Sequence, residues 1–308
     1  MDEKYREKLA KQHYYFLGEH TAVKVCGWTK KALRGEGVCY KEKFYGIKSH
    51  RCAQMSPSIN ICNHACVHCW RERNNSEFGV LDDVDKIVAG LSKGQQVLIS
   101  GYGGYENLDV EKFKEAQEPM HIAISLSGEP LLFPKISILI KAFKLAGKSV
   151  FLVTNGTKPE VLNSIEMPTQ LYVSLEGYNR EKYKELCLLE EDHWDDVLKS
   201  LDVLKSLKDK TRTSLRITCI KGLNMDNAKG FADLILRSDA TFVEVKAYML
   251  VGSSRDRLDL DNMPYHHEVK DFALEIAKEC GYKIVDEHKS SRVVLLMKED
   301  FDGRIMKF

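Results

Sequence analysis

Six of the nine cysteines in this 308-residue chain lie between Cys26 and Cys69, where they form two triplets. The later triplet, which ends at Cys69, also contains Cys62 and Cys66 and has the spacing C-x3-C-x2-C. Three thiolates so close together in the sequence can enclose one compact soft-metal centre, such as an iron–sulfur cluster. A structural zinc site is the alternative, although it normally uses four protein ligands. A three-cysteine site leaves one coordination position open, as a catalytic centre requires.

The earlier triplet, Cys26, Cys39 and Cys52, has the spacing C-x12-C-x12-C, which fits no simple zinc ribbon. Two loops of this length could bring the thiolates together around a second cluster with an open position. Three unrelated cysteines are the alternative. Met1–Lys11 is charged throughout and has no apolar core, so we expect no signal peptide and a reducing compartment. In such a compartment, clustered cysteines indicate metal or redox chemistry rather than disulfides.

The charge of the chain is unevenly distributed although its net value is only +1. Residues 1–52 carry 12 basic and 6 acidic side chains, whereas the rest of the chain carries 34 and 39. With 44% apolar and 30% charged residues, the composition excludes disordered, collagen-like and small disulfide-scaffold proteins. No apolar run approaches the roughly 18 residues of a membrane span, so we expect no membrane association.

From about residue 55 onward, apolar strands alternate with helical patterns. About six such β-then-α units predict an α/β fold with a parallel sheet. The predicted strands are Pro57–Ile61, His121–Leu126, Ser149–Thr154, Leu171–Leu175, Leu215–Ile220 and Phe242–Tyr248. The predicted helices are Asp83–Lys93, Leu108–Gln117, Lys135–Ala146, Lys158–Ser164, Arg180–Lys208 with an interruption near Glu191, Asn227–Arg237 and Tyr265–Cys280.

Five of these strands alternate apolar and polar residues, as where Leu171, Val173 and Leu175 oppose Tyr172 and Ser174. Parallel strands covered on both faces are usually apolar throughout. A curled or closed barrel explains the pattern, because its apolar face meets the helices and its polar face lines a lumen. A flat doubly wound sheet fits less well, and solvated edge strands are the other alternative.

A C-x3-C-x2-C run after the first predicted strand of a six-unit βα chain resembles the radical S-adenosylmethionine (radical SAM) enzymes. The resemblance implies that Cys62, Cys66 and Cys69 hold a 4Fe-4S cluster whose fourth iron binds S-adenosyl-L-methionine. Reduction then cleaves this cofactor to a 5′-deoxyadenosyl radical. The residue before the third cysteine is often aromatic in the family but is His68 here.

The segment after the second predicted strand resembles the Gly-Gly-Glu element that receives the methionine amino group. It consists of Ser127, Gly128, Glu129 and Pro130, with a serine in place of one glycine. An ordinary strand-to-helix turn is the alternative. Active sites of barrels lie at the carboxyl ends of the strands. The resemblance therefore implies further cofactor contacts at the ends of the next two strands, from Thr154, Asn155, Ser174 and Glu176.

The two triplets together resemble the archaeal-type tRNA 4-demethylwyosine synthases. Stretches around both triplets, Ser125–Pro130, Tyr248-Met249 and Arg257-Leu258 carry the likeness over most of the chain. It implies one radical SAM domain over residues 1–308, a partial TIM-type barrel of about six βα units with a polar lumen. Residues 1–54 form an N-terminal cluster-binding extension, 55–250 the barrel core and 251–308 a C-terminal α/β extension.

The resemblance also implies the reaction, a lyase-type carbon–carbon bond chemistry. Two carbons of pyruvate are condensed with N1-methylguanosine, 3′ of the anticodon of tRNA-Phe, to form 4-demethylwyosine. The cofactors are S-adenosyl-L-methionine and two 4Fe-4S clusters, the auxiliary one held by Cys26, Cys39 and Cys52. We expect a cytoplasmic monomer. We also expect an external electron donor, because these 308 residues leave no room for the flavodoxin-like domain of eukaryotic relatives.

A lysine could activate pyruvate by forming a Schiff base with its carbonyl carbon. Lys41 and Lys43 lie between the second and third cysteines of the earlier triplet, so we expect one of them to be catalytic. Contacts with tRNA phosphate are the alternative for both. Lys246, on the inward face of its strand with Glu244, is a rival, although a buried ion pair is the simpler interpretation.

A tRNA substrate requires phosphate contacts and aromatic side chains that support a splayed base. Basic residues near the two triplets are the candidates for phosphate: Lys30, Lys31, Arg34, Lys48, Arg51, Arg71 and Arg73. The aromatic candidates are Trp28, Tyr40, Phe44, Tyr45 and Trp70, some of which must belong to the core. Three other functions stay open: a different radical SAM reaction, a zinc-stabilised RNA-binding protein and an electron-transfer protein.

Overall fold

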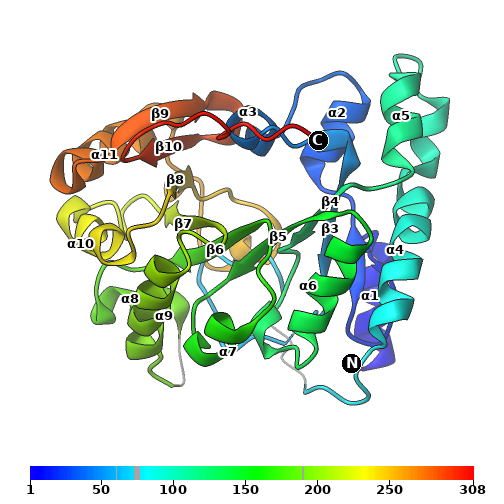
Figure 1. Cartoon of the computed structure of the whole chain (residues 1–308), viewed down its shortest axis with the longest axis horizontal. Helices are drawn as coiled ribbons and strands as arrows, with labels where there is room; N and C mark the ends of the chain where they lie inside the picture. The colour runs from blue at the N-terminus through cyan, green and yellow to red at the C-terminus, as the bar shows by residue number, and fades with distance from the viewer. Residues whose placement is uncertain (60, 73–76, 189–190) are drawn as a thin grey trace.

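The computed structural model describes residues 1–59, 61–72, 77–188 and 191–308. Its strands form one sheet in the order β1-β2-β3-β4-β5-β6-β7-β8-β10-β9 (Figure 1). Strands β3 to β8 are parallel, and each edge of the sheet carries antiparallel strands. The strands are β1 Tyr15–Phe16, β2 Ala22–Lys24, β3 Cys52–Ser56, β4 His121–Ile124, β5 Ser149–Thr154, β6 Gln170–Leu175, β7 Arg212–Cys219, β8 Phe242–Ala247, β9 Lys283–His288 and β10 Val293–Met297.

Helices connect the parallel strands, as the alternation in the sequence predicts. Within the described residues, none of the helices is long and apolar enough to cross a membrane. The helices are α1 Glu3–Lys11, α2 Gly27–Leu33, α3 Tyr40–Tyr45, α4 Val84–Ile99, α5 Val110–Ala116, α6 Ile136–Leu145, α7 Pro159–Ser164, α8 Arg180–Cys187, α9 Trp194–Ser206, α10 Ala228–Ser238 and α11 His266–Cys280.

The prediction of a first strand at Pro57–Ile61 is wrong. Strand β3 ends at Ser56, and the chain turns immediately after it. Ile59 packs against Leu9 of α1 and Leu126, in a small cluster separate from the main core. The apolar side chain of Ile59 therefore packs against α1 rather than in the sheet, and residue 60 of the predicted strand lies outside the described residues.

The alternation along the central strands separates two cores. The outward side chains of β3 to β8 pack against the helices in the main core, among them Val173, Ile217 and Val245. On the inward face, α3 fills part of the lumen. This inner core consists of Tyr40, Phe44, Tyr45, Ile47, Phe151, Tyr172, Phe242, Val293, Leu295 and Met297.

The lumen is polar nearer the carboxyl ends of the strands. Ser174, Arg216 and Glu244 are paired in register across β6, β7 and β8, one inward position beyond Tyr172 and Phe242. The lumen therefore has an aromatic layer near the amino ends of the parallel strands and a charged layer nearer their carboxyl ends.

The C-terminal tail covers the amino end of this inner core. Arg304 donates a hydrogen bond to the Phe44 carbonyl at 2.9 Å, and the Met306 amide donates to Tyr45 at 2.9 Å. The tail ends near α2 and α3 (Figure 1). The tail and the inner core hold α3, and with it Cys39, in place.

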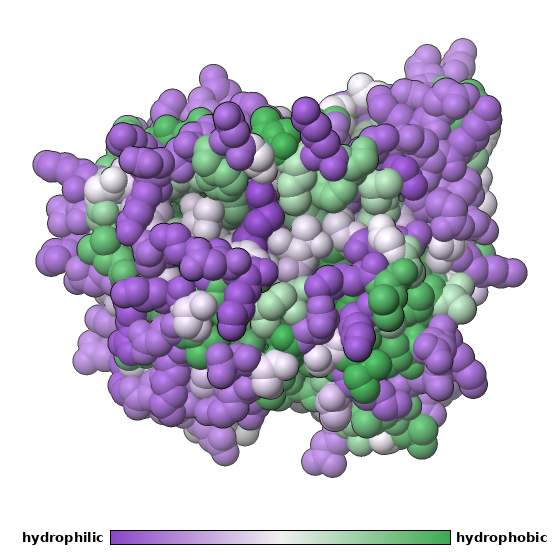
Figure 2. All heavy atoms as spheres, viewed as in Figure 1, coloured by the Kyte–Doolittle hydropathy of each residue, from purple (hydrophilic) through white to green (hydrophobic). Residues whose placement is uncertain are grey.

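From the side shown in Figure 2, the surface is mostly hydrophilic, with smaller hydrophobic patches.

Candidate active site

The later cysteine triplet lies in the loop after β3, at the carboxyl ends of the parallel strands. Cys62, Cys66 and Cys69 are half-buried and line one cavity of about 250 Å³. The same cavity is lined by almost all the residues predicted to bind the cofactor, namely Ser127, Gly128, Glu129, Thr154, Asn155, Ser174 and Glu176. Pro130 is not among its lining residues; it begins a short 3₁₀ helix at Pro130–Leu132. The fold thus brings three strand ends together around the three thiols.

Gly128 fixes the start of the cysteine loop by a close backbone approach. Its φ is +71°, and a Cβ atom added there would lie 1.8 Å from the Ser58 carbonyl oxygen and 2.7 Å from that of Ile61. The next amide, that of Glu129, donates a 2.8 Å hydrogen bond to the Ile61 carbonyl. Only glycine permits both the left-handed conformation and this contact.

Two further elements hold the loop from the other side. The Ala65 and Val67 amides donate to the Cys187 and Leu186 carbonyls at the end of α8, at 2.9 and 2.8 Å. Arg257 donates from Nε to the Val67 carbonyl at 2.9 Å, and from a terminal nitrogen to the Cys69 carbonyl at 2.6 Å. The cysteine loop is therefore fixed by backbone contacts that do not use the thiols.

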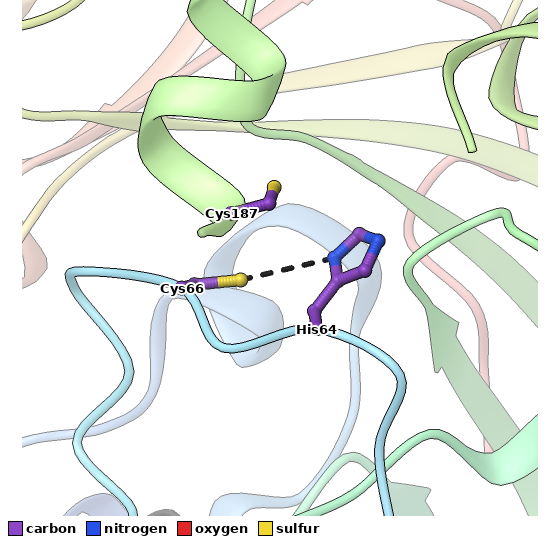
Figure 3. A group of neighbouring side chains, drawn as sticks. All are labelled: His64, Cys66 and Cys187. Atoms are coloured by element: carbon purple, nitrogen blue, oxygen red, sulfur yellow. Dashed lines mark hydrogen bonds between the residues drawn. The ribbon is translucent and has the colours of Figure 1, made fainter. Parts of the chain in front are cut away.

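His64 and Cys187 lie beside Cys66 (Figure 3). His64 Nδ1 is 3.8 Å from the Cys66 sulfur, and its Nε2 is 2.7 Å from the Tyr183 hydroxyl. Burial lowers the pKa of His64 to about 3, so its ring is neutral. A hydrogen bond with Cys187, followed by burial, raises the pKa of Cys66. The sequence alone gave no role to Cys187, which the end of α8 places next to a predicted cluster ligand.

Glu129 links the ends of β4 and β5. Its carboxylate accepts hydrogen bonds from the Thr154 hydroxyl at 2.6 Å, the Asn155 amide at 2.8 Å and the Leu131 amide at 2.9 Å. Burial nevertheless raises the pKa of Glu129 to about 7. These contacts orient the carboxylate at the wall of the cavity, where an ammonium group would stabilise its charged form.

Glu176 lies across the cavity from this element, at the end of β6. It is 8% exposed, and one of its oxygens lies 3.2 Å from His68 Nε2. The contact is not aligned as a hydrogen bond, and this oxygen has no other hydrogen-bond partner in the described part of the chain. A buried acceptor of this kind is costly unless it is paired, which suits a site for a ligand hydroxyl.

The earlier triplet comes from three separate elements. Cys26 caps the amino end of α2 and accepts the Thr29 amide at 3.4 Å, Cys39 precedes α3, and Cys52 begins β3. Burial first, and then the neighbouring Cys26, raise the pKa of both other thiols, that of Cys39 to about 12. The fold therefore assembles these cysteines at one place.

Both triplets have a donor arrangement that fits a cluster better than a single zinc ion. Two thiolates on one tetrahedral zinc lie only about 3.8 Å apart, given a Zn–S bond of about 2.3 Å. Among the described residues, the one group of three potential ligands within 4.8 Å of one another is His64, Cys66 and Cys187. Neither triplet is so compact. Buried thiols that raise one another's pKa also need a cationic centre to become thiolates.

A second cavity, of about 780 Å³, is lined by Cys26 of the earlier triplet and adjoins the cavity of the later triplet, with which it shares Trp70 and Ser127. Its lining includes Cys26 and Lys30 on one side, and Trp70 and Ser127 on the other. Lys24 and Tyr14, which the sequence did not single out, also line this cavity. The Lys24 ammonium is 4.5 Å from the centre of the Tyr14 ring, and burial followed by Lys30 lowers the pKa of Lys24 to about 8.

The two predicted catalytic lysines occupy different environments. Lys43 is exposed and forms an ion pair with Asp286 at 2.7 Å. Lys41 is half-buried, with its ammonium 4.6 Å from the centre of the Tyr172 ring. Burial first, and then the Arg216 guanidinium, lower the pKa of Lys41. Only Lys41 faces the lumen.

The candidates for phosphate contacts do not share one rim. Lys30 and Arg71 line the larger cavity, but the Arg71 guanidinium is buried against Trp70. Lys48 and Arg51 lie at the amino end of β3, where Lys48 pairs with Glu115 at 3.2 Å. Lys31 is exposed beside Trp28, and Arg34 pairs with Glu36 at 2.6 Å. Arg73 lies outside the described residues.

The aromatic candidates divide in the same way. Tyr40, Phe44 and Tyr45 belong to the inner core. Trp28 packs against His288, with ring centres 5.3 Å apart. Of the five, only Trp70 lines both cavities.

Comparison with known proteins identifies the class. Residues 56–235 match the family model described as the radical SAM superfamily, and residues 237–298 match the model for wyosine base formation. The chain therefore belongs to the radical SAM superfamily, whose members use S-adenosyl-L-methionine and a 4Fe-4S cluster. The partial-barrel α/β fold predicted from the sequence is confirmed.

The relatives define the family more closely. The S-adenosyl-L-methionine-dependent tRNA 4-demethylwyosine synthase of Pyrococcus abyssi is 44% identical, over 98% of this chain and 91% of that protein. The synthase of Methanocaldococcus jannaschii is 40% identical, over 95% and 96%. A solved structure of TYW1 with a lysine–pyruvate adduct bound is 37% identical, with a TM-score of 0.89 over 99% of both chains. The chain belongs to the tRNA 4-demethylwyosine synthases, and this prediction from the sequence is confirmed.

Proposed function

We propose that this chain condenses two carbons of pyruvate with N1-methylguanosine of tRNA-Phe to form 4-demethylwyosine. The observation that carries the proposal is the cavity of about 780 Å³, which is lined by Cys26 of the earlier triplet and shares Trp70 and Ser127 with the cavity of the later triplet. Chemistry that joins two small groups on one base needs both reacting centres to open onto a common space. We place the reaction in the cytoplasm, with electrons from an external donor.

In this proposal Cys62, Cys66 and Cys69 hold the cluster that binds S-adenosyl-L-methionine. When bound, the cluster and S-adenosyl-L-methionine would together supply a radical that abstracts hydrogen from the N1-methyl group. Glu129 receives the amino group of the cofactor, because its buried carboxylate gains a cationic partner there. The other cofactor contacts come from the same cavity wall, from Ser127, Gly128, Thr154, Asn155, Ser174 and Glu176. Pro130 keeps the turn after Glu129 rigid.

We assign Cys26, Cys39 and Cys52 to an auxiliary 4Fe-4S cluster. The assignment is supported by their assembly from α2, α3 and β3 around one place in the fold. Three cysteines leave one position open, which suits an oxygen ligand from pyruvate.

We assign the Schiff base to Lys41 rather than to Lys43. The uncharged Lys41 amine attacks the pyruvate carbonyl carbon, and the oxygen leaves as water when the C=N bond forms. Burial and the Arg216 charge lower the pKa of Lys41 and so favour the uncharged nucleophile. The adduct in the TYW1 structure is consistent with a lysine in this role.

The target base enters between aromatic side chains at the larger cavity. Trp70 and Tyr14 offer ring faces there, and Lys24 and Lys30 add positive charge. Lys31 and Arg34, which lie on and next to α2 with Lys30, remain predicted phosphate contacts. Lys48 and Arg51 lie at the amino end of β3 and Arg71 is buried, so these three do not belong to this rim, and the predicted contact Arg73 lies outside the described residues. Stacking supports a splayed base, and Lys24 and Lys30 bind the backbone around it.

The test compares anaerobically reconstituted variants on tRNA containing N1-methylguanosine, with pyruvate, reductant and S-adenosyl-L-methionine. We expect the tricyclic nucleoside from wild type and from Lys43→Arg, but not from Lys41→Arg. Replacing Cys26, Cys39 and Cys52 by alanine should halve the iron content and abolish product, while cofactor cleavage persists. Full product formation by the Lys41→Arg chain would overturn the lysine assignment.

A further inference from the structure

Lys246 is a cation of the lumen to which the proposed mechanism gives no role. It lies on β8, and its neighbours in register are Thr218 on β7 and Val293 on β10. It is half-buried and points inward, like Glu244 two residues earlier. Along β8, Lys246 is the next inward-facing residue after Glu244, which pairs with Arg216.

The negative charge nearest to Lys246 in the sequence is already neutralised. The fully buried Glu244 accepts hydrogen bonds from Arg216 at 3.0 Å, Tyr40 at 2.8 Å and Tyr45 at 2.8 Å. Both carboxylate oxygens are used, and the charge is paired with the guanidinium. The predicted ion pair of Glu244 with Lys246 is therefore replaced by one with Arg216.

Lys246 itself has no anionic partner. Its ammonium donates one long hydrogen bond, of 3.4 Å, to the Ala247 carbonyl. In the described part of the chain, no Asp or Glu oxygen lies within 4.0 Å of it. A partly buried ammonium with one weak contact is costly and gains from an incoming anion.

Lys41 approaches the same region from α3. The Lys41 ammonium and the Arg216 guanidinium lie 4.6 and 4.9 Å from the centre of the same Tyr172 ring. Lys246 is in register with Thr218, two residues beyond Arg216 on β7. With Glu244 neutralised by Arg216, neither amine has an acidic oxygen within 4.0 Å among the described residues. A small anion with a neighbouring carbonyl group matches that pair.

We propose that Lys246 binds the carboxylate of pyruvate while Lys41 forms the imine at its carbonyl carbon. This inference rests on the proposed function, because it deepens the assignment of the pyruvate site. A carboxylate has two oxygens, so one can accept from Lys246 while the other is free for a metal. The ammonium then selects 2-oxo acids over neutral carbonyl compounds of similar size.

The test traps the imine on Lys41 with borohydride and reads the adduct by mass, across a range of pyruvate concentrations. For Lys246→Met, we expect half-saturation at a pyruvate concentration about 10- to 100-fold higher than wild type, as for loss of one charged hydrogen bond. Lys246→Arg should recover much of the affinity. Lys229→Met is the matched control, because Lys229 is an exposed lysine of α10 paired with Asp233 at 3.1 Å.

Methyl pyruvate provides the decisive comparison, since its ester carries no charge. Wild type should form the adduct far better with pyruvate than with the ester, and Lys246→Met should lose most of that preference. Unchanged preference and unchanged half-saturation in Lys246→Met, with iron content equal to wild type, would overturn the inference. No adduct on Lys41 in wild type would instead overturn the proposed lysine assignment, so the two failures are distinguishable.

Discussion

Replacing Gly128 by alanine tests how the fold positions the later cysteine triplet. The backbone at Gly128 has a φ of +71°, which costs an L-residue about 1–2 kcal/mol. The added Cβ would also lie 1.8 Å from the Ser58 carbonyl oxygen, a backbone atom that cannot rotate away. Either the turn after β4 or the segment before Cys62 must therefore move.

A matched variant separates the cost of the Cβ contact from the cost of the left-handed backbone conformation. Gly147 has a φ of +70°, and a Cβ added there meets no atom within 4 Å. Gly147→Ala should therefore cost only the conformational term of about 1–2 kcal/mol. Gly128→Ala should cost at least about 1 kcal/mol more, since the hydrogen bond from the Glu129 amide to Ile61 is strained or lost.

The assay is urea unfolding of the cluster-free chain, followed by cofactor cleavage after reconstitution. We expect Gly128→Ala to lose most of its cleavage of S-adenosyl-L-methionine, while Gly147→Ala cleaves at the wild-type rate. Equal unfolding free energies and equal cleavage rates in the two variants would show that the contact at Gly128 does not position the cysteine loop.

Three further predictions concern buried charges and the loop. Burial gives Glu129 a folded pKa of about 7 against an ordinary value of 4.5, so between these values the folded chain holds a proton that the unfolded chain releases. The cluster-free wild type should thus lose stability relative to Glu129→Gln as pH rises from 4.5 to 7, as measured by urea unfolding. Arg257→Met should lower iron retention at the later triplet, because the Val67 and Cys69 carbonyls lose their charged donor; unchanged iron under chelator would contradict this. Glu244→Gln should destabilise the chain by about 3–5 kcal/mol by leaving a buried guanidinium unpaired, and equal urea midpoints would count against it.

The spacing of the cysteines predicted the class of the site, and the strand periodicity predicted which side chains face the lumen. The alternation around Tyr172 correctly separated the inward from the outward face, because side chains of a strand alternate strictly. The same rule failed at Ile59, an apolar residue that lies in a turn and packs in a small cluster with residues of α1. Short apolar runs do not distinguish a strand from such a turn.

The sequence could not choose between Lys41 and Lys43 for a geometric reason. Residues two apart in a helix lie on different faces, so only one of them can point into the lumen. Which one does so depends on how α3 packs against the inner core, and that packing is a tertiary contact. The place of Cys187 beside Cys66 likewise arises from α8, more than one hundred residues away.

The most direct test of the central claim uses pyruvate labelled with ¹³C at its carbonyl and methyl carbons. The reconstituted chain is incubated with tRNA containing N1-methylguanosine, reductant and S-adenosyl-L-methionine, and the nucleosides are analysed by mass. We expect a new tricyclic nucleoside that carries both labelled carbons. Active cleavage of S-adenosyl-L-methionine without label in any nucleoside would contradict it.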